Sequence, residues 1–236
     1  MIGTLSKKII VAFFILALIL VVSACSSSDG QDGAKSTATT QKKSAANDSK
    51  TRKDIPAKNR PKTKTGSLSI EGMTEDFTFT LADSAELEFT TYIASDMIAE
   101  SASSSEGDSL FVYTNYGGVK NRDARLFFFA RPKSVETSIE EMTELAKETI
   151  QVEGYSTRER LAGNQALVFD MSEVEFDIEK RDKGGTRFLG TVSIFSHGKR
   201  YYWVIIEYPE EFTEGFISRA NAVIEDIMWY DEKPAR

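Results

Sequence analysis

The fold of this chain is decided by residues 186–208, which read TRFLGTVSIFSHGKRYYWVIIEY. β-Branched and aromatic residues are frequent on both sides of the short polar stretch His197-Gly198-Lys199. Such runs predict two β-strands, and a glycine in the short stretch between them predicts a hairpin. We therefore expect antiparallel strands over residues 186–196 and 200–208.

A third strand is predicted over residues 165–180, and Lys183-Gly184-Gly185 marks the turn that joins it to residues 186–196. Directly opposed residues of two paired strands share one face of a sheet. A three-residue loop at 183–185 satisfies this condition, and it predicts that Phe176 lies opposite Val192.

The same argument gives the second hairpin a three-residue loop at 197–199. This register predicts the pairs Ile194 with Tyr202 and Val192 with Val204. The opposite face then carries a second apolar set, which consists of Phe195, Tyr201, Trp203 and Ile205. Because so large an apolar patch is not left in water, we expect the middle of this meander to be covered on both faces.

Two helices are predicted to cover this three-stranded meander. The first begins at one of two overlapping capping boxes, Thr137–Glu140 or Ser138–Glu141, and ends before Gly154. The second covers residues 209–229 and carries an apolar stripe. Earlier strands are expected over residues 68–70, 77–81, 87–93, 110–116 and 124–130. The sequence thus predicts an α+β fold, an α/β/α sandwich whose mainly antiparallel sheet is covered by helices on both faces.

The order of these elements resembles that of the PsbP-like superfamily. The likeness is carried by the strand exit at Arg131-Pro132, by Ser138-Ile139-Glu140-Glu141, and by the hairpin His197-Gly198-Lys199-Arg200-Tyr201-Tyr202-Trp203. It covers residues 68–229 and implies the fold of that family. Its members serve mostly as accessory binding or assembly proteins, and none of their functional residues maps onto this chain.

Residues 1–24 predict an export signal. Lys7 and Lys8 precede an apolar run of 14 residues, Ile9–Val22, and small residues follow it. As a helix this run spans roughly 21 Å, which is short for a hydrocarbon core of about 30 Å. The stretch Val22-Ser23-Ala24-Cys25 is similar to the bacterial lipobox, which implies cleavage before Cys25 and lipidation of its sulfur. The alternatives are an uncleaved membrane anchor and a soluble secreted protein whose cysteine is incidental.

Residues 25–66 predict a disordered basic tether, because their only large aliphatic residue is Ile55 and they show no hydrophobic period. They contain 10 Lys/Arg and 4 Asp/Glu, whereas residues 67–236, the predicted domain, contain 17 and 32. The basic charge indicates either a solvated spacer or attraction to anionic lipid or an anionic wall polymer. The acidic domain argues against binding to nucleic acid.

The sharpest polar pattern is the run Glu173-Val174-Glu175-Phe176-Asp177-Ile178-Glu179. The period of a strand places its four carboxylates on one face. Because oxygen ligands suit Ca²⁺ or Mg²⁺, these four are weak candidate metal ligands: Glu173, Glu175, Asp177 and Glu179. The alternatives are a solvated face, paired with Arg187 or Arg200, and a surface for a basic protein partner.

No enzymatic activity and no cofactor are predicted. One cysteine and one histidine exclude an internal disulfide and a Cys/His zinc site. Cys25 is assigned to lipid, and His197 to an exposed turn, since catalysis would require a nucleophile or carboxylate beside it. The aromatic residues are assigned to the core, with a ligand cleft as the alternative; they are Phe127, Phe128, Phe129, Tyr201, Tyr202 and Trp203.

Together these features predict a lipoprotein anchored to the cell membrane, facing the extracytoplasmic side. Its domain is expected to act as a non-enzymatic binding or accessory module. The expected partners are the lipid bilayer, through Cys25, and an envelope protein or an anionic wall polymer. The alternatives are a lipoprotein that binds a small ligand or a divalent cation, and a hydrolase built on carboxylates.

Overall fold

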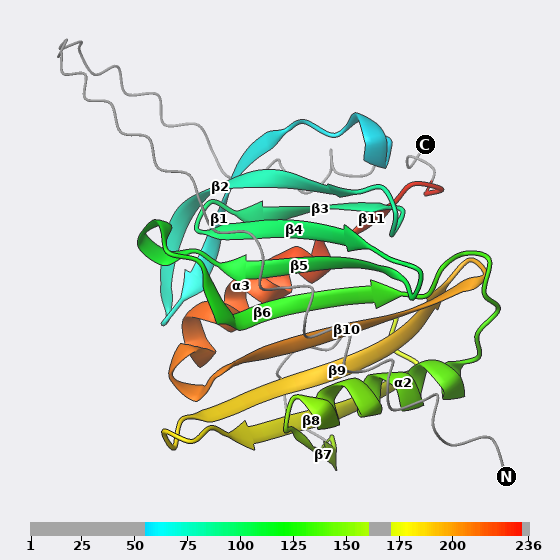
Figure 1. Cartoon of the computed structure of the whole chain (residues 1–236). Helices are drawn as coiled ribbons and strands as arrows, with labels where there is room; N and C mark the ends of the chain where they lie inside the picture. Colours follow the sequence, from blue (N-terminus) through cyan, green and yellow to red (C-terminus); the bar gives the residue numbers. More distant parts are fainter. Residues whose placement is uncertain (1–54, 161–170, 233–236) are drawn as a thin grey trace, which may run out of the picture. The chain divides into compact units, whose positions relative to one another are not determined.

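The computed structural model describes residues 55–160 and 171–232, which form two antiparallel β-sheets and two α-helices (Figure 1). The four-stranded sheet, called sheet A, has the order β1 (Thr63–Ile70), β2 (Met73–Ser84), β3 (Phe89–Ala94), β11 (Met228–Trp229). The seven-stranded sheet, called sheet B, has the order β4 (Met97–Ser103), β5 (Asp108–Thr114), β6 (Asn121–Ala130), β10 (Arg200–Pro209), β9 (Arg187–His197), β8 (Val174–Arg181), β7 (Ser156–Glu159). The helices are α2 (Ile139–Val152) and α3 (Thr213–Glu225), and 3-10 turns occupy Ala57–Asn59, Tyr116–Gly118 and Glu210–Phe212.

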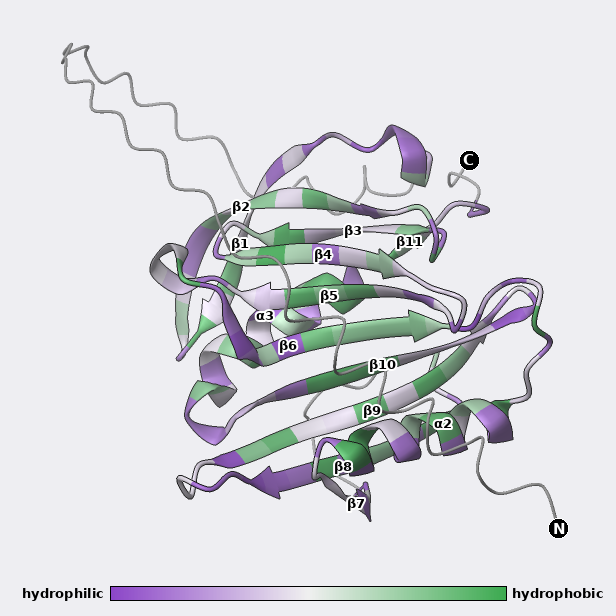
Figure 2. Ribbon diagram, in the orientation of Figure 1, coloured by the Kyte–Doolittle hydropathy of each residue, from purple (hydrophilic) through white to green (hydrophobic). Residues whose placement is uncertain are grey.

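Sheet B carries an apolar core on each of its faces. On one face α2 covers β9 and β10, and its Met142 shares a core with Trp203. On the other face the core is shared with α3 and sheet A, and it contains Phe128, Phe216 and Phe89. Figure 2 shows hydrophobic stretches in the central strands β6 and β10, whereas β8 and β7, at one edge of the sheet, are more polar. The central strands of sheet B are therefore buried on both sides.

The predicted α/β/α sandwich is wrong. The strands divide between two sheets, and sheet A takes part in covering the face for which a helical layer alone was expected. β3 and β4 lie side by side in Figure 1 but do not pair. β11 instead pairs with Phe89 and Thr90 on the edge of β3 opposite β2. Because β11 comes from the far end of the chain, local sequence patterns carry no signal for this division.

The hairpin β8–β9 has the predicted register. Phe176 lies opposite Val192, and the backbone N–H of Asp182 donates to the carbonyl of Thr186 at 3.0 Å, so residues 183–185 form the loop. Gly185 adopts a φ of +88°, a conformation that a glycine reaches at little cost. The prediction from alternation and turn composition is therefore confirmed here.

The predicted register of the hairpin β9–β10 is wrong by one residue. His197 pairs with Arg200, so the loop contains two residues, and Ile194 lies opposite Trp203 instead of Tyr202. Gly198 begins this loop with a φ of +61°, as glycine does in tight hairpin turns. The slip moves every side chain of β10 to the other face relative to β9. Trp203 and Ile205 therefore pack under α2 with Ile194, and Tyr202 and Val204 pack with Phe195.

The two helices differ in how well their ends were predicted. Ser138 caps the N-terminus of α2, and its hydroxyl accepts from the backbone N–H of Glu141 in a capping box. Gly154, just beyond the C-cap Glu153, has a φ of +84°. The second helix was predicted to continue to Trp229, but α3 ends at Glu225. Trp229 instead lies in β11, with its ring 5.4 Å from that of Phe89. Burial of this large side chain overrides the continuing helical pattern.

Regular structure begins inside the segment predicted to be a tether. Residues 57–59 form a 3-10 turn, and β1 starts at Thr63, before the predicted domain boundary at Gly66. Arg60 is buried and forms an ion pair with Asp226 of the chain's far end. The predicted signal and most of the predicted tether lie outside the described residues. Among the residues described, no helix is long and apolar enough to cross a membrane.

Candidate functional site

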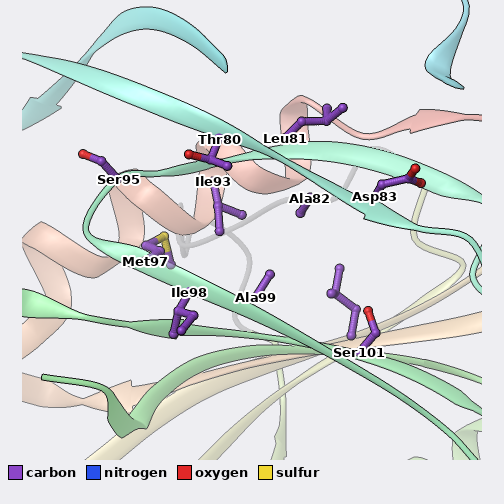
Figure 3. A pocket seen from close by; sticks show the side chains of 11 residues that line it. Thr80, Leu81, Ala82, Asp83, Ile93, Ser95, Met97, Ile98, Ala99 and Ser101 are labelled. Atoms are coloured by element: carbon purple, nitrogen blue, oxygen red, sulfur yellow. The ribbon is translucent and has the colours of Figure 1, made fainter. Parts of the chain in front are cut away.

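A cleft of about 430 Å³ opens between sheet A and the edge strand β4 (Figure 3). Its lining from sheet A comprises Thr80, Leu81, Ala82, Asp83 and Ile93, and its lining from the β3–β4 turn and sheet B comprises Ser95, Met97, Ile98, Ala99, Ser101 and Leu110. Ala82 and Ile93 point toward the space above Ala99, whereas Leu81 and Asp83 point away from it. The cleft follows from the separation of β3 and β4, because the two strands diverge after their shared turn.

The floor of this cleft is apolar and its rim is polar. Ile93, Met97 and Leu110 are buried aliphatic residues. Ala82 and Ala99 are small and leave space between the two sheets. The rim carries the hydroxyl groups of Thr80 and Ser101. This arrangement suits a bound peptide whose apolar side chains contact the floor while its polar main chain lies at the rim. The volume lies in the range of ordinary ligand sites, about 300–1,000 Å³.

β4 also offers main-chain hydrogen-bonding groups. It pairs with β5 on one side, and in the described part of the chain no strand pairs with its other side. Natural edge strands are protected by lysine, proline, bulges or very short length. β4 has the sequence MIAESAS over seven residues, without lysine or proline, and residues 100–103 are exposed. An open edge and an apolar cleft thus lie along the same strand.

The opposite edge of sheet B is different. β7 has four residues, and its Arg158 forms an ion pair with Glu179 of β8 at 3.2 Å. Arg160, which directly follows this strand, forms an ion pair with Glu175. A short, charged edge of this kind resists the addition of another strand. The two edges of sheet B therefore differ in their capacity to bind an extended segment.

The structure assigns protein partners to all four carboxylates of the predicted acidic strand. Glu173 accepts from the hydroxyl of Ser196 at 2.5 Å, and Glu175 accepts from the hydroxyl of Ser193 at 3.0 Å. Asp177 is buried and accepts from the hydroxyl of Thr191 at 3.2 Å. Glu179 pairs with Arg158 and, at 2.9 Å, with the predicted partner Arg187, which holds its pKa below the usual range. The other predicted partner, Arg200, pairs with Asp108 instead.

These contacts give the acidic strand a structural role. In the described residues, no group of three or more His, Cys, Asp or Glu side chains is arranged to hold a metal ion. The carboxylates of β8 follow the strand in parallel rather than converging on a point, as the period of a strand requires. Their partners lie on the neighbouring strands β7 and β9 and at Arg160, which directly follows β7.

His197 is not simply exposed in its turn. Its ring stacks on Trp229 with centroids 4.0 Å apart, and Nε2 lies 2.8 Å from Oδ1 of Asp231. This hydrogen bond lowers the pKa of the Asp231 carboxyl. A smaller cavity of about 290 Å³ lies here, lined also by Lys133, Lys199 and Tyr230. The histidine thus fastens the hairpin β9–β10 to β11, a contact between distant segments that sequence spacing does not indicate.

A buried polar cluster lies at the end of α2, where sequence reasoning predicted none. Glu207 of β10 forms an ion pair with Arg125 of β6, and Arg125 also pairs with Glu153 at 2.8 Å. Burial raises the pKa of Glu207, although Arg125 opposes the shift. Burial and the neighbouring Glu207 raise the pKa of Tyr155. The signal in the sequence was a single charged residue, Glu207, inside the apolar run of β10.

The basic residues of the predicted tether are partly used by the fold. Residues 25–66 carry 10 Lys/Arg and 4 Asp/Glu, and four of those cations and none of the anions lie in residues 55–66. Asp226 binds two of the four, Arg60 and, at 2.6 Å, Lys64. The ammonium group of Lys58 lies 4.2 Å from the ring centre of Tyr230. Residues 25–54 therefore keep six cations and four anions, a formal charge of +2.

The aromatic residues assigned to the core are placed there on both faces of sheet B. Phe127, Phe129 and Trp203 belong to the core under α2, and Phe129 and Trp203 stack 4.7 Å apart. Phe128 and Tyr202 belong to the core shared with α3 and sheet A. Tyr201 is partly buried against the core under α2. None of the six lines the cleft beside β4.

Comparison with known proteins assigns no family. No protein-family model matches the chain, and no curated protein sequence matches it. The resemblance to the PsbP-like superfamily therefore stays a prediction. The predicted lipidation site, Cys25, lies outside the described residues.

Proposed function

We propose that this protein is a lipid-anchored accessory module of the cell envelope, and that its domain binds an extended segment of another envelope protein along β4. The bound segment would add a strand to sheet B and place alternate side chains in the adjacent cleft. The observation that carries this proposal is the coincidence of a sheet edge with which no described strand pairs and a cleft of about 430 Å³ that has an apolar floor.

The physical basis is the addition of a strand to an open sheet edge. Main-chain hydrogen bonds supply affinity without requiring a particular sequence, and side-chain pockets supply selectivity. Successive side chains of a strand point to opposite faces, so every second residue of the partner meets the cleft. The floor formed by Ile93, Met97 and Leu110 favours apolar side chains at those positions. Such binding needs no catalytic group, in line with the predicted non-enzymatic role.

The proposed function also requires that Cys25 is lipidated and anchors the protein to the membrane. Cys25 follows a stretch similar to the lipobox, and two acyl chains bind a membrane far more stably than one. The variant Cys25→Ala should leave the membrane fraction and appear in the soluble or secreted fraction. A Cys25→Ala protein that sediments with membranes as completely as the wild type would contradict lipid anchoring through this residue.

A site-specific crosslinking experiment tests the binding site. A photoreactive phenylalanine derivative replaces Ser101 of β4 in the full chain, and in a control it replaces Thr157 of the opposite edge strand β7. We expect an envelope protein to be captured from intact cells at position 101 and not at position 157. Equal capture at both positions, or no capture at position 101, would overturn the proposal.

Two proline substitutions sharpen this test. Successive N–H groups of an edge strand point alternately to the neighbouring strand and to the free edge, so Ser101→Pro and Ala102→Pro remove one N–H of each kind. The variant that removes an N–H bonded to β5 should unfold at lower denaturant concentration. The variant that removes an N–H at the free edge should keep wild-type stability. When the photoreactive residue is placed at position 99 instead of 101, this variant should no longer capture the partner. If the stable proline variant binds as well as the wild type, strand addition at β4 is wrong.

A small ligand is the second candidate for the same cleft, because its volume suits one. Thermal unfolding of the full chain with a panel of metabolites distinguishes the two. Stabilisation by one small molecule, with no protein captured at position 101, would favour a ligand-binding lipoprotein.

A further inference from the structure

The strands that form the cleft have an unusual charge composition. Residues 67–116, which include β2 to β5 and half of β1, contain ten Asp and Glu and no Lys, Arg or His. The other 120 residues of the predicted domain, 117–236, contain 22 Asp and Glu and 17 Lys and Arg. The acidic character of the domain is thus concentrated in the part that carries the open edge.

Every cation that neutralises this part comes from another part of the chain. Four of its carboxylates form ion pairs, Asp96 with Arg219, Glu100 with Lys120, Glu88 with Lys133, and Asp108 with Arg200. Five are exposed and form no ion pair within the described residues, and these are Glu71, Glu75, Asp76, Glu86 and Glu106. These five carboxylates therefore leave negative charge at the β1–β2 hairpin and in the β2–β3 and β4–β5 loops.

Two of these unpaired carboxylates belong to loops at one end of the cleft. Arg200 donates to the main-chain carbonyl of Glu86 at 2.7 Å and to the carboxylate of Asp108 at 2.5 Å, which brings the β2–β3 loop and the start of β5 together. Glu106 lies two residues before Asp108 in the β4–β5 loop. Asp83, which lines the cleft, accepts from the Tyr230 hydroxyl at the same end of β2.

We propose that the segment bound along β4 is a basic polypeptide, with small apolar residues at every second position and Lys or Arg at the end that lies beside Glu86 and Glu106. This inference rests on the proposed function and assigns the chemistry of the partner. Unpaired carboxylates at the end of an apolar cleft match cations that flank an apolar strand. Their field steers such a segment to the edge and disfavours acidic ones.

The same charges disfavour the two occupants that the chain itself could supply. In a symmetric antiparallel pair centred on the middle of β4, Glu100 of one copy would face Glu100 of the other, and like charges in that position are destabilising. The chain's own segment 25–54 carries a charge of only +2, and Arg60 and Lys64 are held by Asp226. A segment from another polypeptide therefore fits best.

Binding of synthetic peptides to the full chain in detergent micelles tests the inference. The probes are Lys-Lys-Val-Thr-Val-Ser-Val-Lys-Lys and the same core flanked by Gln or by Glu, each with a fluorescent label for anisotropy. We expect the Lys-flanked peptide to bind more tightly than the Gln-flanked one and the Glu-flanked one to bind least. The preference should weaken as salt is raised, because exposed charges are screened.

A pair of double variants locates the charges that matter. Glu86→Gln with Glu106→Gln should weaken binding of the Lys-flanked peptide about threefold to tenfold, as expected for two exposed ion pairs. The control, Glu71→Gln with Glu75→Gln, makes the same change of charge at the β1–β2 hairpin. That hairpin lies at the other end of β2 from Asp83, about ten residues or roughly 33 Å away, which exceeds the screening length of about 8 Å. The control double variant should therefore bind the Lys-flanked peptide with an affinity within a factor of two of the wild type.

The outcomes separate the two levels of the proposal. If the three peptides bind equally and the stable β4 proline variant abolishes binding, the edge site stands and the basic partner is wrong. If none of the peptides binds and no protein is captured at position 101, the binding function itself fails. If the polypeptide captured at position 101 in cells is a second copy of this chain, the assignment of a basic partner is overturned.

Discussion

The strand β8 and the hairpin β1–β2 are both rich in carboxylates, but those carboxylates meet different surroundings. On β8, Glu175 forms an ion pair with Arg160, which directly follows β7. Glu179 forms ion pairs with Arg158 of β7 and Arg187 of β9. At the hairpin β1–β2, Glu71, Glu75 and Asp76 are exposed and form no ion pair within the described residues. The two regions thus combine the same residue types with different neighbours.

The difference shows that acid density alone does not identify a binding surface. The run from Glu173 to Glu179 is the denser pattern in the sequence, yet its groups are used to hold three neighbouring strands together. Residues 67–116 have a lower density, but they include no cation of their own. What decides whether a carboxylate is available to a partner is the charge of the strands beside it.

The largest effect is expected where a carboxylate is buried and paired. Asp226→Ala should lower the free energy of unfolding by about 3–5 kcal/mol, because it removes the buried carboxylate that forms an ion pair with the buried Arg60. Urea denaturation of the full chain measures this loss. Double replacement, Asp226→Ala with Arg60→Met, should recover part of the stability. No recovery would mean that the ion pair does not account for the loss.

A smaller effect is expected inside β8. Asp177 is buried and accepts from Thr191, so Asp177→Ala should cost about 1–3 kcal/mol by leaving polar groups without partners. Glu175→Ala provides a less buried comparison on the same strand. If both variants unfold with wild-type midpoints in urea, β8 is not held by its carboxylates, and its acidic face is available for another role.

The pH dependence of stability should reveal Glu207. Burial raises its pKa, so the folded state binds more protons than the unfolded state above the ordinary glutamate pKa of about 4.3. The wild type should therefore lose stability as pH rises from there toward the raised pKa of Glu207. Glu207→Gln removes this contribution, so its stability relative to the wild type should increase over the same window. Urea midpoints at several pH values measure it, and a constant difference would contradict the raised pKa.

The smallest effect is expected at the hairpin β1–β2. Glu75→Gln should change the free energy of unfolding by less than about 0.5 kcal/mol, because the side chain is exposed and makes no ion pair within the described residues. Urea denaturation in parallel with Asp177→Ala makes the comparison direct. A loss above 1 kcal/mol would show that this carboxylate has a structural partner after all.

The sequence predicted local features of the fold well and the candidate site poorly. The start of α2 and the register of β8–β9 depend on residues close together in the chain, Ser138 with Glu141 and Phe176 with Val192, and both were correct. The register of β9–β10 depended on whether Gly198 opens a two- or a three-residue loop, and glycine is compatible with both. The cleft was missed because its two walls come from different sheets.

By itself, the sequence determined most of the strands, the start of α2, the central positions of the core, and the uneven distribution of charge between residues 67–116 and the rest. It predicted no strand at β4, β7 or β11. Alternation, capping and composition are local or additive properties, so they can be read without knowing contacts. Only the tertiary structure decided that Trp229 leaves the helical pattern to join β3, that the strands divide into two sheets, and that β4 is left with an open edge beside a cleft. These outcomes depend on contacts between distant residues, which no local pattern encodes.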